Sequence, residues 1–197
     1  MRVIPVLLLV LTLTACDGLD SATTPTERGP ISSRERSLIY AADGAAQQGN
    51  FPAAERDYLT AMNEGSGHIE AHLGLAQLYI KNGQNDKALP ILEKALQLQP
   101  DDALANYLTG KIYLDSNRFD DAATAFDRGL TQQPDNLDLA IGKGITEDMR
   151  GNHRAAQMQY LRGIKTNPKA ALTKIRTNLA MSYLLSGEPK KAVDLLK

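Results

Sequence analysis

The same pattern of small and apolar residues returns along this chain every 34 residues. Its clearest marker is an alanine that stands at Ala54, Ala88, Ala122 and Ala156, and a fifth, Ala192, follows after 36 residues. An interval of this size predicts an array of small structural units. Each unit has to bury its apolar face on its neighbour, so the units are expected to stack into an elongated fold.

Each unit has the pattern of two helices joined by a tight turn. The first helix contains a small residue that lets its partner helix approach, at Ala42, Ala76, Gly110, Gly144 and Ala180. The turn contains a residue that tolerates the left-handed conformation at a helix end, at Gly49, Gly83, Asn117, Gly151 and Gly187. Aromatic residues are only 5% of the chain and Trp is absent, so we expect an aliphatic, alanine-rich core, which favours helices.

Larger side chains should fill the grooves between these helices. Three positions after the small residue, a tyrosine suits this role in three units, at Tyr79, Tyr113 and Tyr183. In the other two units the same position holds Ala45, which is small, and Glu147, which does not fit an apolar groove. Ala45 is therefore a weak match to the pattern, and Glu147 is a mismatch.

The second helix of each unit places its core residues on one face. Ala88, Leu92 and Ala95 are spaced i, i+4 and i+7, and Ala122, Phe126 and Gly129 repeat that spacing. The second helices should end before a turn residue, which is Ser66, Pro100, Pro134 or Pro168. Together these signals predict ten helices, at residues 35–48, 52–64, 69–82, 86–98, 103–116, 120–132, 137–150, 154–166, 170–186 and 189–197.

These blocks resemble tetratricopeptide repeats, whose period is 34 residues. The resemblance implies an all-α fold, a right-handed superhelix of about five helix-turn-helix units. The expected units span residues 35–68, 69–102, 103–136, 137–170 and 171–197, with two extra residues near 169–171. The chain stops at Lys197 inside the last helix, so we expect the apolar end of that unit to contact a partner or a second copy.

The first residues have the features of an export signal. Arg2 is followed by an apolar run of about a dozen residues, which is shorter than the roughly 20 needed to span a bilayer. Leu13-Thr14-Ala15-Cys16 resembles a bacterial lipobox, which implies removal of residues 1–15 and acyl chains such as palmitate on Cys16. An ordinary secretory signal is the alternative. Residues 16–34 then form a flexible tether, because they are rich in Gly, Pro, Ser and Thr and lack an apolar period.

The resemblance to a lipoprotein also implies a location in the bacterial cell envelope, facing the periplasm. We expect the protein to be anchored in the outer membrane. Asp17 keeps the inner membrane as the alternative, since an aspartate after the acylated cysteine resembles a signal that retains lipoproteins there.

The sequence contains no pattern typical of a catalytic or metal site. His68 and His72 are four residues apart, but no third ligand accompanies them, so we interpret them as surface histidines. No phosphate-binding loop, nucleophile elbow or CxxC pair is present. The net charge is −1, which gives no electrostatic footprint for nucleic acid. We therefore expect a protein that is not an enzyme and needs no cofactor or metal.

Partner binding is expected on the concave face, which the first helices line in tetratricopeptide arrays. The candidate residues occupy the corresponding positions and are mostly apolar: Ile39, Leu73, Gln77, Ile80, Tyr107, Lys111, Leu114, Ile141, Ile145, Met149, Met181 and Leu184. Such a groove suits an apolar or amphipathic segment. The alternative is that part of this stripe belongs to the core between adjacent units.

The last third of the chain resembles a particular group of envelope lipoproteins. GKGITEDMRGNHRAAQMQYLRGIKTNP and TNLAMSYLLSGEPKKAVDLL are similar to the last two units of the TadD family, which assists assembly of the tight-adherence (Flp) pilus. The resemblance implies an adaptor for a secretin or other pilus components. A type IV pilus pilotin of the PilF/PilW kind and an NlpI-like scaffold for peptidoglycan enzymes are the alternatives.

Overall fold

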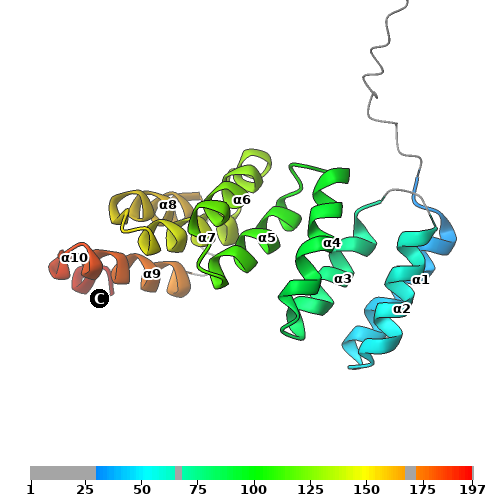
Figure 1. Cartoon of the computed structure of the whole chain (residues 1–197). Coiled ribbons are helices and arrows are strands. Elements are labelled where there is room, and N and C mark those ends of the chain that lie inside the picture. The colour runs from blue at the N-terminus through cyan, green and yellow to red at the C-terminus, as the bar shows by residue number, and fades with distance from the viewer. Residues whose placement is uncertain (1–29, 65–67, 167–171, 197) are drawn as a thin grey trace, which may run out of the picture.

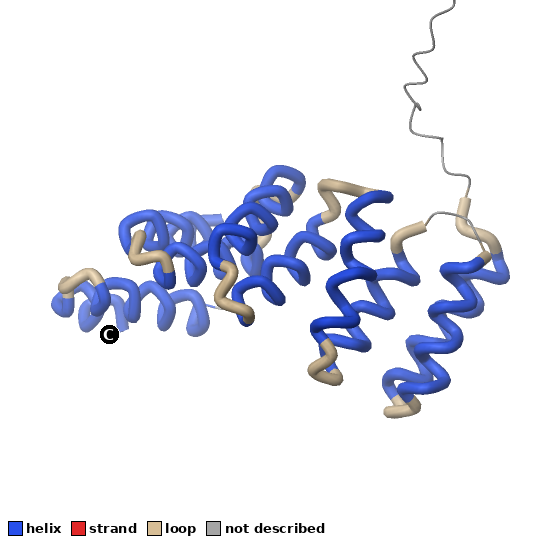
Figure 2. The backbone as a smooth tube through the Cα atoms, in the orientation of Figure 1, coloured by secondary structure: helices blue, strands red, loops and turns tan. Residues whose placement is uncertain are grey.

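The computed structural model describes residues 30–64, 68–166 and 172–196. These residues form ten α-helices and no strand, connected by short turns (Figure 2). The helices are α1 (Ser33–Gln47), α2 (Phe51–Asn63), α3 (Glu70–Lys81), α4 (Asn85–Leu98), α5 (Ala103–Asp115), α6 (Phe119–Gln132), α7 (Leu137–Met149), α8 (His153–Thr166), α9 (Leu172–Leu185) and α10 (Pro189–Leu196). Every boundary lies within two residues of the predicted one, so the helical pattern is confirmed.

The helices are arranged as successive antiparallel pairs that form a curved array (Figure 1). Each odd-numbered helix contacts the next odd-numbered helix as well as its own partner, from α1 through to α9. The even-numbered helices of the described chain make no such contacts with one another. The odd helices therefore form the inner, concave layer and the even helices the outer layer.

Helix ends are fixed by short-range signals in the sequence. Gly49, Gly83, Gly151 and Gly187 have φ between 71° and 79°, and Asn117 has φ of 59°, which confirms the predicted left-handed turns. Side chains also cap helix starts: Ser32 accepts from the Glu35 amide and Asn50 from the Ala53 amide. The turns between paired helices are thus set locally, before any packing between units.

Small residues let large rings lie between the helices. An added Cβ on Gly110 of α5 would stand 2.8 Å from the ring of Phe126, and one on Gly142 of α7 would stand 2.5 Å from the same ring. A Cβ on Gly144 would overlap the ring of Tyr160. The predicted close approach at Gly110 and Gly144 is confirmed, and Gly142 adds a second approach from the following unit.

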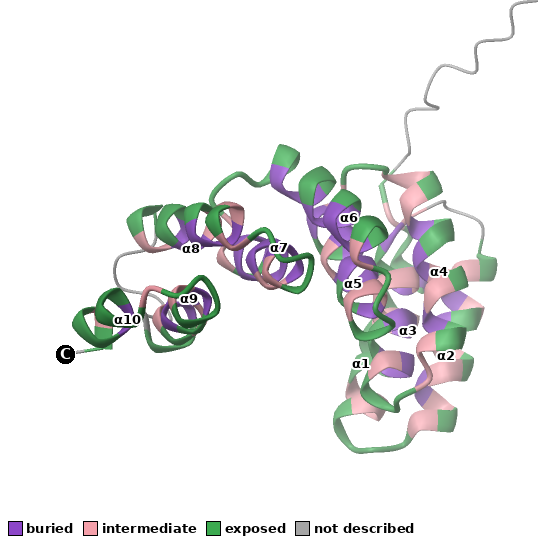
Figure 3. Cartoon of the chain, turned by 60° about the vertical axis from the view of Figure 1, so that its left-hand side comes forward, coloured by how far each residue is buried: buried purple, intermediate pink, exposed green. Residues whose placement is uncertain are grey.

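Three core clusters lie along the described part of the array, and Figure 3 shows burial concentrated where the helices face one another. One cluster includes Leu75, Leu92 and Ile112, a second surrounds Phe126, and a third contains Tyr160 and Ile175. The predicted stripes of α4 and α6 are buried. Alanine and aliphatic side chains dominate these clusters, as the composition predicts.

Glu147 departs from the common packing in a way that the sequence did not reveal. It is buried, but its carboxylate lies 3.1 Å from the Nζ of Lys143 and 2.9 Å from the amide of Asn152. Burial alone would raise the pKa of Glu147, but the bonds from Asn152 and Lys143 outweigh it and lower that pKa. Lys143 also donates to Asp127 of α6 at 2.7 Å. The fourth unit therefore has an ion-pair cluster at the position where three other units have a tyrosine.

Several predictions concern residues outside the described ranges. They include the signal peptide at 1–15, Cys16, most of the tether, Ser66, Pro168 and the extra residues near 169–171. The helices that the structure describes include none with the length and apolar character needed to cross a membrane.

Candidate partner-binding surface

The twelve candidate residues fall into three groups by exposure. One, Ile141, is only 2% exposed and packs in the cluster around Tyr160, so it is a core residue and is not available to a partner. Six are partly buried: Ile39, Leu73, Ile80, Tyr107, Leu114 and Ile145. Five are exposed: Gln77, Lys111, Met149, Met181 and Leu184.

The partly buried residues pack against the core from the inner layer. Tyr107 lies against two core clusters, and its ring is 6.3 Å from that of Phe126 between centroids. Leu114 packs on the second cluster and Ile145 on the third. The alternative that part of the stripe is core thus applies to these positions, where a charged substitution would disturb packing as well as any binding.

Among the candidate residues, the exposed large apolar ones lie in the carboxyl-terminal half of the inner layer. Met149 of α7 is 55% exposed, and Met181 and Leu184 of α9 are 53% and 50% exposed. Helices α7 and α9 contact each other, so these side chains belong to one continuous layer. We refer to Met149, Met181 and Leu184 as the methionine patch. Flexible methionines suit apolar surfaces of varied shape.

The two helices that carry the methionine patch, α7 and α9, are connected to each other and to α8 through one carboxylate. Asp148 of α7 accepts from the Tyr160 hydroxyl of α8 at 3.1 Å and from the Ser182 hydroxyl of α9 at 2.7 Å. The Nδ1 of His153 lies 2.9 Å from the same carboxylate. Burial, with Asp148 adding to it, raises the pKa of Tyr160, so this phenol stays a donor. Sequence reasoning missed Ser182, which lies 34 residues from Asp148 in the chain, and it also missed the contact of His153 with Asp148.

The amino-terminal half of the inner layer is more polar. Gln77 of α3 and Lys111 of α5 are exposed there, and Asp43 of α1 accepts a hydrogen bond from the buried Tyr58 of α2. Lys111 makes no ion pair with any described residue. Among the candidates, the exposed residues of the first half are therefore polar, and those of the second half are apolar.

The histidine pair has structural contacts. The Nδ1 of His68 lies 3.2 Å from the buried carboxylate of Glu35, and the Nδ1 of His72 lies 3.2 Å from the His68 carbonyl oxygen. Burial lowers the pKa of His72. Within residues 30–64, 68–166 and 172–196, no group of three His, Cys, Asp or Glu side chains is arranged to hold a metal ion.

The fold and this surface define a class: a helical-repeat scaffold whose inner layer offers side chains to other proteins. A sequence model of the tetratricopeptide repeat matches residues 40–103 and 73–136. The chain therefore contains tetratricopeptide repeats and is a scaffold for protein–protein interaction.

Solved structures of the MamA protein share this fold. One, titled a crystal structure of MamA protein, is 21% identical and superposes with a TM-score of 0.73 over 83% of this chain and 88% of that one. A second, MamA from Desulfovibrio magneticus RS-1, is 14% identical with a TM-score of 0.75 over 85% and 93% of the two chains. At these identities the likeness concerns the fold alone.

Two curated proteins match at the level of sequence. The human protein O-mannosyl-transferase TMTC1 is 26% identical over 159 residues, which are 78% of this chain and 18% of that protein. The peroxisomal targeting signal receptor of Candida albicans is 24% identical over 115 residues, 58% of this chain and 19% of that protein. The chain spans less than a fifth of the length of these relatives.

Proposed function

We propose that this protein is a non-enzymatic adaptor lipoprotein of the bacterial envelope, which binds an apolar segment of a partner on its concave surface. The observation that carries the proposal is the methionine patch, with three large apolar side chains at least half exposed on two contacting inner helices. Exposed apolar side chains that gather on one surface are typical of interaction sites.

An amphipathic helix is the ligand that this surface fits best. Its apolar face would lie on Met149, Met181 and Leu184, and its polar face would remain in water. The relative from Candida albicans is, by its name, a receptor for a targeting signal, which supports recognition of a partner's segment as the kind of task. No part of the transferase activity in the name of the human relative is proposed for this chain.

Acylation of Cys16 would hold the array near a membrane surface. More than one acyl chain is needed for stable anchoring, because each buried CH₂ contributes only about 0.8 kcal/mol. The tether of residues 16–34 lets the array reach partners without entering the bilayer. The outer membrane is the proposed location, and Asp17 leaves the inner membrane as the second candidate.

The proposed task is to assist assembly or localisation of a Tad/Flp pilus secretion apparatus, through contact with its secretin or another component. The similarity of residues 142–168 and 177–196 to the TadD family supports this choice. A PilF/PilW-like pilotin and an NlpI-like scaffold for peptidoglycan enzymes are the second candidates. A deletion strain distinguishes them: loss of Flp pili and surface adherence supports the first, whereas normal pili contradict it.

Anchoring is tested by the intact mass of the membrane-extracted protein. We expect a chain that begins at Cys16 and carries acyl mass, and we expect a Cys16→Ser variant to leave the membrane fraction. Retention of residues 1–15 without acyl mass would contradict the lipoprotein assignment.

Binding is tested by substitutions on the methionine patch. The double variant Met149→Glu and Met181→Glu should lose at least tenfold in affinity for a secretin or pilus component recovered with the acylated protein from membranes, because it places two charges on the proposed apolar contact. Met158→Glu on the outer helix α8 is the matched control, since Met158 is 64% exposed. Helical circular dichroism should be unchanged in both. Equal binding by both variants would remove the patch from the interface.

A further inference from the structure

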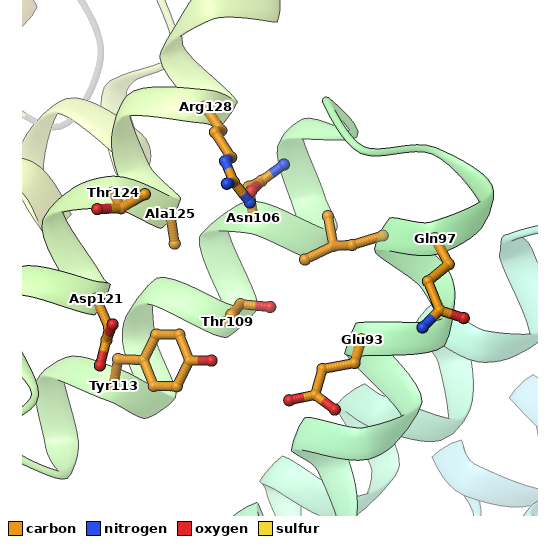
Figure 4. Close-up of a pocket in the computed structure, with 10 residues that line it drawn as sticks. Glu93, Gln97, Asn106, Thr109, Tyr113, Asp121, Thr124, Ala125 and Arg128 are labelled. Atoms are coloured by element: carbon orange, nitrogen blue, oxygen red, sulfur yellow. The ribbon is translucent and has the colours of Figure 1, made fainter.

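A polar groove lies between the second and third helix pairs, on the side of α5 that faces α4 and α6. Its volume is about 450 Å³, which is within the range of ligand sites. Asn106, Thr109 and Tyr113 of α5 form its floor, Glu93 lies on the α4 wall and Arg128 on the α6 wall (Figure 4). Helix α4 packs less closely on α5 than the other outer helices pack on the inner helices that follow them.

Two buried polar atoms in this groove have no hydrogen-bond partner among the residues that the structure describes. They are the Oδ1 of Asn106 and the Oγ1 of Thr109, in side chains whose residues are 1% and 4% exposed. The amide nitrogen of Asn106 is satisfied, because it donates to the Pro100 and Asp102 carbonyl oxygens at 2.9 Å each. Buried polar groups without partners are costly, so this pair indicates a place where something else supplies hydrogen bonds.

The repeat allows a comparison with the same position in other units. Thr109 corresponds to Leu75 in the second unit and to Leu179 in the fifth, and both leucines are fully buried in the core. An apolar residue can therefore close this position in the fold. The third unit instead keeps a hydroxyl there and leaves the groove open.

The fourth unit shows which group fits such a groove. Thr109, Glu93 and Tyr113 correspond by the 34-residue interval to Lys143, Asp127 and Glu147. The Nζ of Lys143 lies 2.7 Å from Asp127 and 3.1 Å from Glu147, so an ammonium group occupies the equivalent junction. In the second-to-third junction the carboxylate of the outer helix is present, but no described residue supplies an ammonium to it.

The end of the groove that contains Glu93 is acidic, because the positive charges near the groove are paired or lie at its other end. Asp121 of α6 is paired with Arg118 at 2.7 Å. Arg128 lies at the end of the groove near Asn106 in Figure 4, whereas Glu93, Thr109 and Tyr113 surround the other end. Glu93 makes no ion pair with any residue that the structure describes.

We propose that this groove is a second binding site, which takes a lysine side chain from an extended segment of a partner protein. The ammonium donates to the Glu93 carboxylate and to the Thr109 hydroxyl, as Lys143 donates to Asp127 and Glu147 in the next unit. A backbone N–H of the same segment donates to the Oδ1 of Asn106. An ammonium has three donors, and the hydroxyl of Thr109 can accept one of them.

This site is separate from the concave surface. Successive residues of an α-helix are turned by about 100°. Asn106, Thr109 and Tyr113 therefore share one face of α5, while Tyr107, Lys111 and Leu114 share another. The groove could hold its segment while the methionine patch holds a different one, so failure of either site leaves the other intact.

An ammonium supplied within the chain tests the chemistry of the groove without any partner. Thr109→Lys repeats the arrangement of Lys143, and Thr109→Met is the matched control with a long side chain and no charge. We expect the unfolding equilibrium constant of Thr109→Lys to be about threefold smaller than that of Thr109→Met. The difference should disappear when Glu93→Gln is added to both. A less stable Thr109→Lys protein, or a difference that survives Glu93→Gln, would overturn the proposal.

A displayed library of random 12-residue peptides tests the ligand. Peptides are selected on the wild-type protein and depleted on Thr109→Lys, whose own ammonium blocks the site. We expect the recovered peptides to contain lysine, and replacement of that lysine by norleucine to weaken binding about tenfold. Binding should persist on the Met149→Glu and Met181→Glu variant. Peptides without lysine, or none that distinguish the two proteins, would overturn the proposal.

Discussion

The glycines of the inner helices illustrate how much a single residue decides in this fold. Gly142 of α7 and Gly110 of α5 contact the ring of Phe126 from two units, and a Cβ at either would approach it to less than 3 Å. The ring is contacted from both sides and is buried, so it has little room to move. Gly44 of α1 is also helical, but a Cβ there would meet nothing within 4 Å. The same substitution should therefore have opposite effects at the two kinds of site.

Gly142→Ala should lower the free energy of unfolding by about 1–3 kcal/mol, because the new methyl group overpacks the Phe126 site. Gly44→Ala should raise that free energy by about 0.5–1 kcal/mol through helix propensity. Chemical denaturation of both variants measures the contrast. A neutral Gly142→Ala would show that Phe126 can be displaced without cost and that the close approach is not needed.

Residues whose role depends only on local backbone could be predicted from the sequence, and residues whose role depends on a distant partner could not. The sequence pattern predicts left-handed turns at Gly83 and Asn117, because the need for this backbone conformation arises within a few residues. Gly142 was not recognised, since its neighbour Phe126 lies in the preceding unit. Glu147 was correctly seen as unsuited to an apolar groove. Its partner Lys143 was missed because the usual residue at that position, Leu75 or Leu179, is apolar.

At the scale of the helices, phenol–carboxylate hydrogen bonds connect neighbouring helices in addition to the contacts of the apolar core. Tyr79 of α3 donates to Glu55 of α2 at 2.6 Å, and Tyr160 of α8 donates to Asp148 of α7. Each bond requires the proton of the phenol. The pKa of Tyr79 is raised to about 12, mainly by burial and further by the hydrogen bond and charge of Glu55.

These bonds predict a loss of stability at alkaline pH. Below pH 10, the ordinary phenol value, both the folded and the unfolded chain keep the protons of the tyrosines. Above it the unfolded chain releases protons that the folded chain still holds, so the free energy of unfolding falls as pH rises. Urea titrations from pH 8 to 11 should show this slope, and Tyr79→Phe should reduce it. An unchanged slope in Tyr79→Phe would mean that this phenol does not titrate differently in the two states.

At the scale of the helices, one part of the partner-binding surface could be predicted and another could not. Periodicity correctly placed the candidates on the first helix of each unit, and these helices form the inner layer. Periodicity could not separate the half-buried Tyr107 from the exposed Met181, because exposure depends on the distance between neighbouring units. That distance is set by side chains such as Phe126 and Asp148, which belong to other helices.

For the whole molecule, the weakest interface between neighbouring units limits how cooperatively a stacked array behaves. Apolar or ion-paired side chains fill the equivalent position in other units, through Leu75, Lys143 and Leu179, but Thr109 leaves it open. The array should therefore open most readily at this junction, between residues 33–98 and 103–196, although Ile112 of α5 shares a core cluster with Leu75 and Leu92. A boundary in the middle of the chain would let the two parts adjust to a partner that contacts both.

Native-state hydrogen exchange measures this boundary directly. We expect amides of α3 and α4 to share one opening free energy and those of α6 and α7 to share another, as local unfolding follows structural blocks. Thr109→Leu should bring the two values closer and raise the lower one by about 1 kcal/mol, because it buries an apolar side chain and removes a hydroxyl without a partner. Thr109→Val, which removes the hydroxyl but fills little of the groove, is the control and should have the smaller effect. Uniform exchange along the wild-type array, unchanged by Thr109→Leu, would show that the groove is not a weak junction.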